Sequence, residues 1–199
     1  MKKILVIVVL GLFLITPSWA DDIRDFQIEG ISLGDSLLDY VNKEQIEKDK
    51  QHESPYKNND FFITILDLKN FNSKTYDFIR FHLRRDDETY KIFHIGGTIS
   101  YRNKDFKECT TKKNEIAKEL VKLFGADKKQ EGKLQKHAYD KTGNSITLST
   151  YFNLSSGRIR LVCINWSEKL TNEKGWEDSL SVNIYSDEFR KWLNDKAYK

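Results

Sequence analysis

The sequence is poor in cysteine, proline and methionine, with two, two and one of these among 199 residues. Beyond residue 20 it has no long apolar run, so we expect no later transmembrane helix. It also lacks a Gly-x-Ser-x-Gly motif, a His-Glu-x-x-His motif and a glycine-rich phosphate loop. These absences leave the common serine hydrolases, zinc proteases and nucleotide-binding enzymes without support.

The first twenty residues have the features of a cleaved export signal. Lys2 and Lys3 precede an apolar run over 4–15, and small residues at Ser18 and Ala20 predict cleavage after Ala20. The alternative is a retained membrane anchor, although the run is short for a bilayer span. No cysteine follows the predicted cleavage point, so no lipid would be attached there. We therefore expect residues 21–199 to be a soluble protein of the periplasm, or a secreted one.

The charge of the expected mature chain is close to balanced. The whole sequence has 33 basic and 30 acidic residues, and two of the basic ones, Lys2 and Lys3, lie in the signal. A chain with so little net charge has no general electrostatic attraction for nucleic acid. We therefore expect no nucleic-acid partner.

The two cysteines, Cys109 and Cys163, are expected to form a disulfide, because a lone pair in an oxidising compartment is most simply bridged. The alternative is two buried free thiols. Cys109 lies on the apolar face of an expected helix over 109–124, and Cys163 lies in an expected buried strand over 159–166. We expect the chain to fold around this helix packed on this strand, with the bridge contributing about 4 kcal/mol in the chain-entropy description.

Hydrophobic periodicity predicts the element order α-β-β-β-α-β-β-β-β-α. The helices are expected over 36–48, 109–124 and 187–198, and the strands over 61–69, 76–85, 90–102, 134–139, 146–152, 158–166 and 180–185. Because the strands do not alternate singly with helices, we expect an α+β fold with helices packed on an antiparallel sheet. A helix followed by a meander occurs twice, near 31–102 and 104–185, which would give two α-β-β-β units in tandem before the C-terminal helix. The residues show no repeat, so a single domain over 21–199 is the prediction.

Residues that suggest chemistry are few. If the strand register pairs Phe81 with Ile95, then His82 and His94 face each other, and two histidines could begin a metal site. The alternative is a polar sheet face shared with Arg80 and Arg84, whose charges would repel a metal ion. We therefore expect no metal, no cofactor and no catalytic residue, and a hydrolase is the least favoured function.

Surface recognition has more support than catalysis. Several aromatic residues stand in polar settings, and Trp176, in the polar stretch 172–178, is the best candidate for an exposed ring. The alternative is that helices cover most of these rings as core. The candidate ligand-binding residues are Trp166, Trp176, Arg80, His82 and His94.

Two stretches carry a resemblance to known proteins. Asp25–Tyr40, together with the ending formed by Tyr185–Phe189, Trp192 and Lys196–Lys199, resembles an uncharacterised family of small exported proteins of marine alphaproteobacteria. This resemblance implies secretion and no particular activity.

A second resemblance is local and lies near the start of the expected mature chain. Gly30–Ser36 with Val41 is similar to the opening motif of envelope domains of the BamE/SmpA and β-lactamase-inhibitor-like types, which combine helices with an antiparallel sheet. The chain lacks the lipoprotein cysteine of the former type, which argues against anchoring in the outer membrane.

These observations lead to two functional hypotheses. The first is a non-enzymatic protein of the periplasm or envelope that binds another envelope protein through a sheet face. The second is a protein that binds a small ligand, a sugar or a peptide, through aromatic residues around Trp166 and Trp176. The sequence does not decide the oligomeric state.

Overall fold

The computed structural model describes residues 22–51, 55–67, 75–101 and 106–199. Its α-helices are α1 (Lys43–Lys48), α2 (Phe106–Phe124), α3 (Glu168–Lys174) and α4 (Asp187–Asp195), with short 3-10 helices η1 (Ile23–Asp25), η2 (Leu37–Asp39) and η4 (Ala126–Lys128). The strands are β1 (Phe61–Asp67), β2 (Phe78–Arg84), β3 (Ile92–Ser100), β4 (Lys129–Glu131), β5 (Gln135–Lys136), β6 (Ile146–Leu154), β7 (Gly157–Asn165) and β8 (Ser179–Ser186). The expected signal, residues 1–20, lies outside the described residues. No helix within them is long and apolar enough to cross a membrane.

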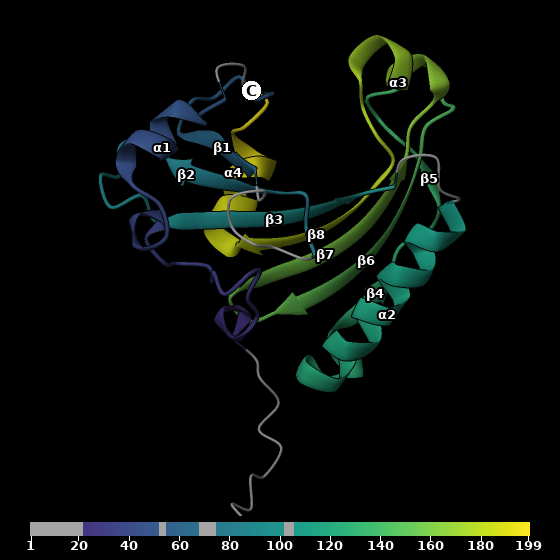
Figure 1. Ribbon diagram of the computed structural model, residues 1–199. Helices are drawn as coiled ribbons and strands as arrows, with labels where there is room; N and C mark the ends of the chain where they lie inside the picture. Colours follow the sequence, from purple (N-terminus) through teal and green to yellow (C-terminus); the bar gives the residue numbers. More distant parts are fainter. Residues whose placement is uncertain (1–21, 52–54, 68–74, 102–105) are drawn as a thin grey trace, which may run out of the picture.

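The strands form one eight-stranded antiparallel sheet, in the order β1-β2-β3-β8-β7-β6-β4 with β5 paired to β6. The meanders β1–β3 and β6–β8 meet where β3 pairs with β8. Helices packed on an antiparallel sheet confirm the predicted α+β class. Figure 1 shows β6 to β8 bending upward to α3, with α2 along the outside of the bend and α4 near the other end of the strands.

One face of the sheet holds the main hydrophobic core. Successive side chains of a strand point to opposite faces, so Ile79, Phe81 and Leu83 of β2 all enter this core. Over β6 and β7 the core is closed by α2, whose Leu120 and Phe124 are buried in it. The apolar face predicted for this helix is therefore the face that packs on the sheet.

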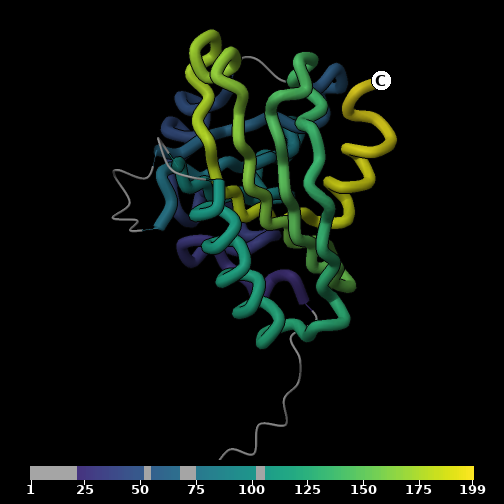
Figure 2. The backbone as a smooth tube through the Cα atoms, turned by 90° about the vertical axis from the view of Figure 1, so that its right-hand side faces the viewer, coloured from purple at the N-terminus to yellow at the C-terminus, as the bar shows by residue number. Residues whose placement is uncertain are grey.

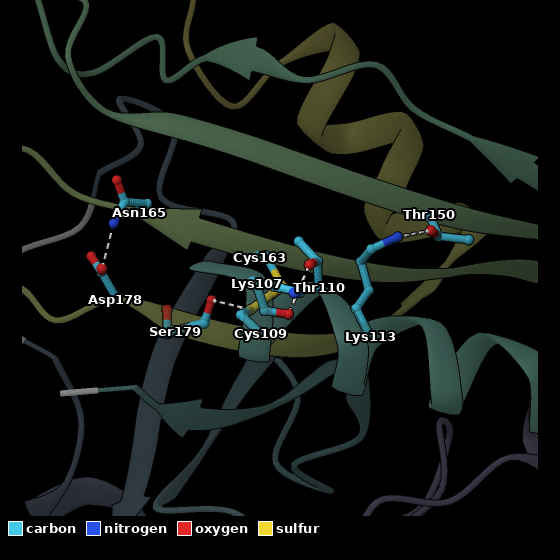
Figure 3. Close-up of a disulfide and its surroundings, with 9 residues drawn as sticks. All are labelled: Lys107, Cys109, Thr110, Lys113, Thr150, Cys163, Asn165, Asp178 and Ser179. Carbon is cyan, nitrogen blue, oxygen red and sulfur yellow. Dashed lines mark hydrogen bonds between the residues drawn. A yellow bond between two sulfur atoms is a disulfide. The ribbon is translucent and has the colours of Figure 1, made fainter. Parts of the chain in front are cut away.

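A disulfide joins α2 to the sheet. Cys109 of α2 and Cys163 of β7 are bonded, with their Cα atoms 5.9 Å apart, which confirms the pairing expected from the sequence (Figure 3). Tyr101 and Leu180 are buried around the bridge. The bridge fixes the start of α2 over the centre of the sheet.

The opposite face of the sheet is partly covered by α4. The hydroxyl of Ser186 accepts a hydrogen bond from the Phe189 N–H and caps this helix. Phe189 and Trp192 are buried against Phe61 and Phe93. Figure 2 shows α2 and α4 on opposite sides of the strands. Because α4 covers only one end of the strands, the other end of this face stays open.

The helix predicted over 36–48 is wrong in its extent. The chain forms η2 and then α1, which starts afresh because the Asn42 side chain accepts a hydrogen bond from the Gln45 N–H, at 2.8 Å. An asparagine in this position competes with continuation of a helix and favours a new start.

Other elements differ from the sequence prediction. Of the strand expected over 134–139, only Gln135–Lys136 forms, as β5, and neither β4 nor α3 was predicted. The register between β2 and β3 is irregular at His82 and Leu83. Gly97 allows a close approach in β3, because a Cβ at this position would lie 2.6 Å from the Tyr76 ring.

Candidate functional site

The open half of the α4 face lies toward α3. Strand register places His82, His94 and Tyr185 side by side in one row, under α4. In the direction of α3 the same face next presents Arg80 and then Thr98 and Ser181, which are cross-strand partners. The rings are covered by α4, whereas the side chains toward α3 are short and polar. This leaves space over the part of the face that lies toward α3.

This space is a hollow of about 1010 Å³, here called the sheet hollow. Its floor comes from five strands and its wall from the segment after α3 and the residue after β7. The lining residues are Ile65, Asp67, Asp77, Phe78, Arg80, Thr98, Ser100, Ile164, Trp166, Gly175, Trp176, Glu177, Ser179 and Ser181. Hydroxyl groups, charged groups and apolar side chains therefore share one concave surface.

Four rings stand in a row beside the sheet hollow, here called the aromatic ladder. They are His137, Trp166, Trp176 and Tyr139, and successive ring centroids are 4.4, 4.6 and 4.8 Å apart. Adjacent rings are tilted by 51° to 55°, an arrangement that favours aromatic contact over a parallel sandwich. Both indoles are half-buried and Tyr139 is 54% exposed, so the ladder presents ring surface to solvent.

Trp166 is positioned by a carboxylate, and Trp176 by the turn that ends α3. Asp178 accepts hydrogen bonds from the Trp166 N–H at 2.7 Å and from the side-chain amide of Asn165 at 2.5 Å. The second bond is drawn in Figure 3. Gly175 ends α3 with a φ of 68°, a left-handed conformation that glycine adopts without strain, and the chain then turns back to Trp176. The indoles are thus held by backbone and side-chain contacts.

A second carboxylate fixes the neighbouring loop. Asp140 accepts hydrogen bonds from the N–H of Ser145 at 2.9 Å and from its hydroxyl at 2.6 Å. The Ser145 oxygen in turn accepts from the Ser167 N–H at 2.9 Å. The hydrogen bonds from Ser145 and Thr142 hold the pKa of Asp140 well below its usual range. This network ties the stretch that carries Tyr139 to the stretch that carries Trp166.

Arg80 is the cation of the sheet hollow. It is exposed, and its guanidinium makes no hydrogen bond or ion pair within residues 22–51, 55–67, 75–101 and 106–199. Its charge lies close enough to His82 and His94 to contribute to the lowering of the pKa of both. Its donors are therefore free to bind a ligand, unlike those of Arg158 and Arg160, which bond to Asn153 and Ser149.

A second hollow, of about 1250 Å³, lies on the other side of Trp166 against α3, and we call it the α3 hollow. It shares Trp166, Gly175 and Glu177 with the sheet hollow. The rest of its lining consists of polar residues and one tyrosine: Tyr101, Asn144, Asn165, Ser167, Glu168, Lys169, Thr171, Asn172 and Asp178. The two hollows meet along one edge of the aromatic ladder.

His82 and His94 lie outside both hollows, buried under α4. Their Nδ1 atoms are 2.8 Å apart, the Tyr56 hydroxyl lies 3.0 Å from His82 Nε2, and His94 Nε2 lies 3.2 Å from Asn183 Oδ1. Burial is the main cause that lowers the pKa of both, that of His94 to about 3. They are therefore neutral parts of the core at neutral pH.

The structure thus separates the five candidate residues into two groups. Trp166, Trp176 and Arg80 line the sheet hollow together, whereas His82 and His94 face each other away from it, in the register that the sequence analysis considered. Of the other aromatic residues, Trp192 and Tyr101 are buried, in agreement with the core alternative.

Tyr139 and His137 were missed by the sequence analysis. Both come from the irregular segment between β5 and β6, while the indoles lie at the two ends of α3. No spacing along the chain links these positions. The only signal was an exposed tyrosine beside the turn 141–144, and that is too common to identify a site.

The described linings of the two hollows offer groups that can bind a ligand. Neither has a histidine among its described lining residues, so no histidine–acid pair faces either space. Within the described part of the chain, no three or more His, Cys, Asp and Glu residues are grouped to hold a metal ion. Rings, hydroxyls, amides and one unpaired guanidinium provide stacking and hydrogen bonds.

Comparison with known proteins gives no further guidance. No protein-family model, no curated protein and no solved structure matches the chain. The function is therefore argued from the hollows and the aromatic ladder alone.

Proposed function

We propose that the chain is a non-enzymatic exported protein that binds a small ligand, a sugar or a peptide, in the sheet hollow. The observation that carries the proposal is the joint placement of Trp166, Trp176 and Arg80 around one concave space. Ligand sites combine apolar and aromatic surface with a few polar groups that fix orientation, and this composition is present here. The fixed backbone around both indoles means that little ordering is needed on binding, which favours affinity.

Export is part of the proposal. It is supported by the Cys109–Cys163 disulfide, because such bonds persist in oxidising compartments. Residues 1–20, which resemble a cleaved signal, would direct the chain to export. When the full sequence is expressed in a bacterium with its own N-terminus, the product in the periplasm or medium should have the mass of a chain starting at Asp21. A product that stays in the cytoplasm at full length would contradict export.

A second candidate function is docking of another envelope protein on the same face. It is favoured by two exposed apolar residues at the β5 end of the site, Leu134 and Tyr139, which are 57% and 54% exposed. Tyrosine, tryptophan and arginine are also enriched at protein interfaces. A partner would have to cover the aromatic ladder, because α4 covers the other half of this face.

The ligand proposal is tested by thermal stabilisation of the folded chain with a panel of sugars and peptides. A ligand that binds only the folded state stabilises it by about 2.7 kcal/mol at a hundredfold excess over the dissociation constant, and so raises the melting temperature in a concentration-dependent way. Trp176→Ala should lose this shift, since it removes a half-buried ring from the hollow.

The matched control is Tyr198→Ala, which removes a ring that is 60% exposed and does not line either hollow. It should keep the full ligand-induced shift. If no member of the panel shifts the melting temperature of the unaltered chain, the ligand proposal fails. A photo-crosslinker at position 139 that then captures one discrete envelope protein would favour docking.

A further inference from the structure

We infer that the ligand is an uncharged oligosaccharide that extends from the sheet hollow past Trp166 into the α3 hollow. This inference rests on the proposed function, namely that a ligand occupies the sheet hollow. It adds the chemical class of the ligand and the path along which it lies.

The aromatic ladder fits the surface of a sugar ring. A pyranose has faces of C–H groups and a rim of hydroxyls, so it stacks on an aromatic face, which is rich in π electrons, while its rim reaches polar groups. Trp166 and Trp176 border the same space as Thr98, Ser100 and Ser181. Stacking surface and hydroxyl partners therefore lie in one hollow.

The charges of the lining argue most directly against an anionic ligand. In the sheet hollow, Asp67, Asp77 and Glu177 stand with Arg80, and in the α3 hollow acids again accompany one lysine. Carboxylates outnumber cations in both hollows, so a polyanion would be repelled, and a polycation would be drawn to the acids but opposed by Arg80. A polyol can bond to lining groups of either charge, because its hydroxyls donate to carboxylates and accept from a guanidinium.

Most of the described strands under the sheet hollow have no free edge for pairing with a peptide strand. β2, β3, β8 and β7 each have a hydrogen-bonded neighbour on both sides. The outer edge of β1 bonds to the preceding segment, since Gln51 N–H donates to Ile63 O and Ile65 N–H donates to Asp49 O. A peptide that adds a strand needs an open edge, so the interior strands and the bonded stretch of β1 do not favour this common mode of peptide recognition.

The joined hollows indicate a ligand of several sugar units. Each hollow, about 1010 and 1250 Å³, is at or above the upper end of the range of about 300–1,000 Å³ for drug-sized ligands. The shared residues Trp166, Gly175 and Glu177 form the boundary that a chain must cross. Beyond it, amides such as Asn144, Asn165 and Asn172 supply both donors and acceptors.

The test is calorimetric titration with neutral glucose and N-acetylglucosamine oligomers, each series running from the monomer to the hexamer. Affinity should rise with length and change little with salt, because no net charge is neutralised. Trp176→Ala should weaken binding of the longer oligomers about tenfold, as truncation of a central ring does at binding sites. Asn172→Ala, in the α3 hollow, should weaken the hexamer and leave the dimer unchanged, while Tyr198→Ala should leave both unchanged.

The outcomes separate the inference from the proposed function. If uncharged peptides bind in a Trp176-dependent way and no oligomer does, the function stands and the glycan inference is wrong. Binding restricted to acidic polymers and abolished by salt would also overturn it, as would monomers that bind as tightly as hexamers. If sugars and peptides alike fail to bind, the proposed function itself fails.

Discussion

At the scale of single residues, the buried pair His82 and His94 determines how the end of the sheet under α4 is built. One set of neutral tautomers satisfies the whole chain of hydrogen bonds: the Tyr56 hydroxyl donates to His82 Nε2, His82 Nδ1–H donates to His94 Nδ1, and His94 Nε2–H donates to Asn183 Oδ1. A proton added to either ring would place a positive charge in a space closed by Phe189. On His94 it would also set the new Nδ1–H against the Nδ1–H of His82.

We predict that the chain loses stability as the pH falls below about 6.5, the usual pKa of histidine. The folded pKa of His94 is lowered to about 3, so the unfolded chain binds more protons below 6.5 and stability falls with pH. Between pH 7 and 5, His94 alone should cost about 2 kcal/mol. Urea unfolding across this range measures it, with His94→Gln expected to be less stable at pH 7 and less sensitive to pH. A free energy of unfolding independent of pH from 7 to 5 would contradict the assignment.

Gly96 provides a second test at this scale. A Cβ at this position would lie 2.6 Å from Asn183 Oδ1 and 3.1 Å from His94 Cε1, so the Asn183 side chain that bonds to His94 would have to shift. Gly96→Ala should lower the free energy of unfolding by about 1–3 kcal/mol, because the crowded side chains must shift. Chemical denaturation measures the change, and an alanine variant as stable as the unaltered chain would show that this part of the sheet is more open than described.

At the scale of elements, α2 is held on the sheet at two places. The disulfide joins its first turn to β7, and one turn further along, Lys113, only 1% exposed, donates a hydrogen bond to the Thr150 hydroxyl of β6 at 2.5 Å (Figure 3). The same ammonium lies 3.7 Å from Glu131 of β4. Burial lowers the pKa of Lys113, and the charge of Glu131 acts in the opposite direction.

Removal of the bridge should destabilise the fold without abolishing it. The two cysteines are 54 residues apart, and a loop of that size corresponds to about 4 kcal/mol in the chain-entropy description, with real proteins often showing less. The double variant Cys109→Ala, Cys163→Ala should therefore unfold about 2–4 kcal/mol more easily in urea. The unaltered chain treated with a reductant is the matched control and should behave alike. An unchanged unfolding midpoint in both would mean that the bridge does not hold α2.

Most elements could be predicted from the sequence because their signals are local. The alternation of Ile79, Phe81 and Leu83 indicated β2, and Ser186 indicated the start of α4. β4 and α3 could not be predicted in this way, because β4 is a charged edge strand held by pairing with β6 and α3 is a single polar helix of seven residues. Their placement depends on tertiary contacts that no local pattern contains.

At the scale of the whole molecule, the candidate site is formed by both halves of the chain. Arg80 comes from the first meander, while Trp166 and Trp176 flank α3 in the second, and they meet because β3 pairs with β8. The sequence identified these three residues by type, as exposed aromatic and cationic candidates. It could not show that they share a hollow or that His82 and His94 do not, because strand order and the position of α4 decide both.

The central claim is that a ligand binds beside Trp166 and Trp176, and nuclear magnetic resonance of the indole N–H groups tests it most directly. The mature chain would have three indoles, and the third, Trp192, donates its N–H to Asn58 Oδ1 in the core, at 3.0 Å, which makes it an internal control. On titration with the neutral hexamers, we predict that the signals of Trp166 and Trp176 shift and that the signal of Trp192 stays. Shifts confined to Trp192, or no shift with any oligosaccharide or peptide, would contradict the account.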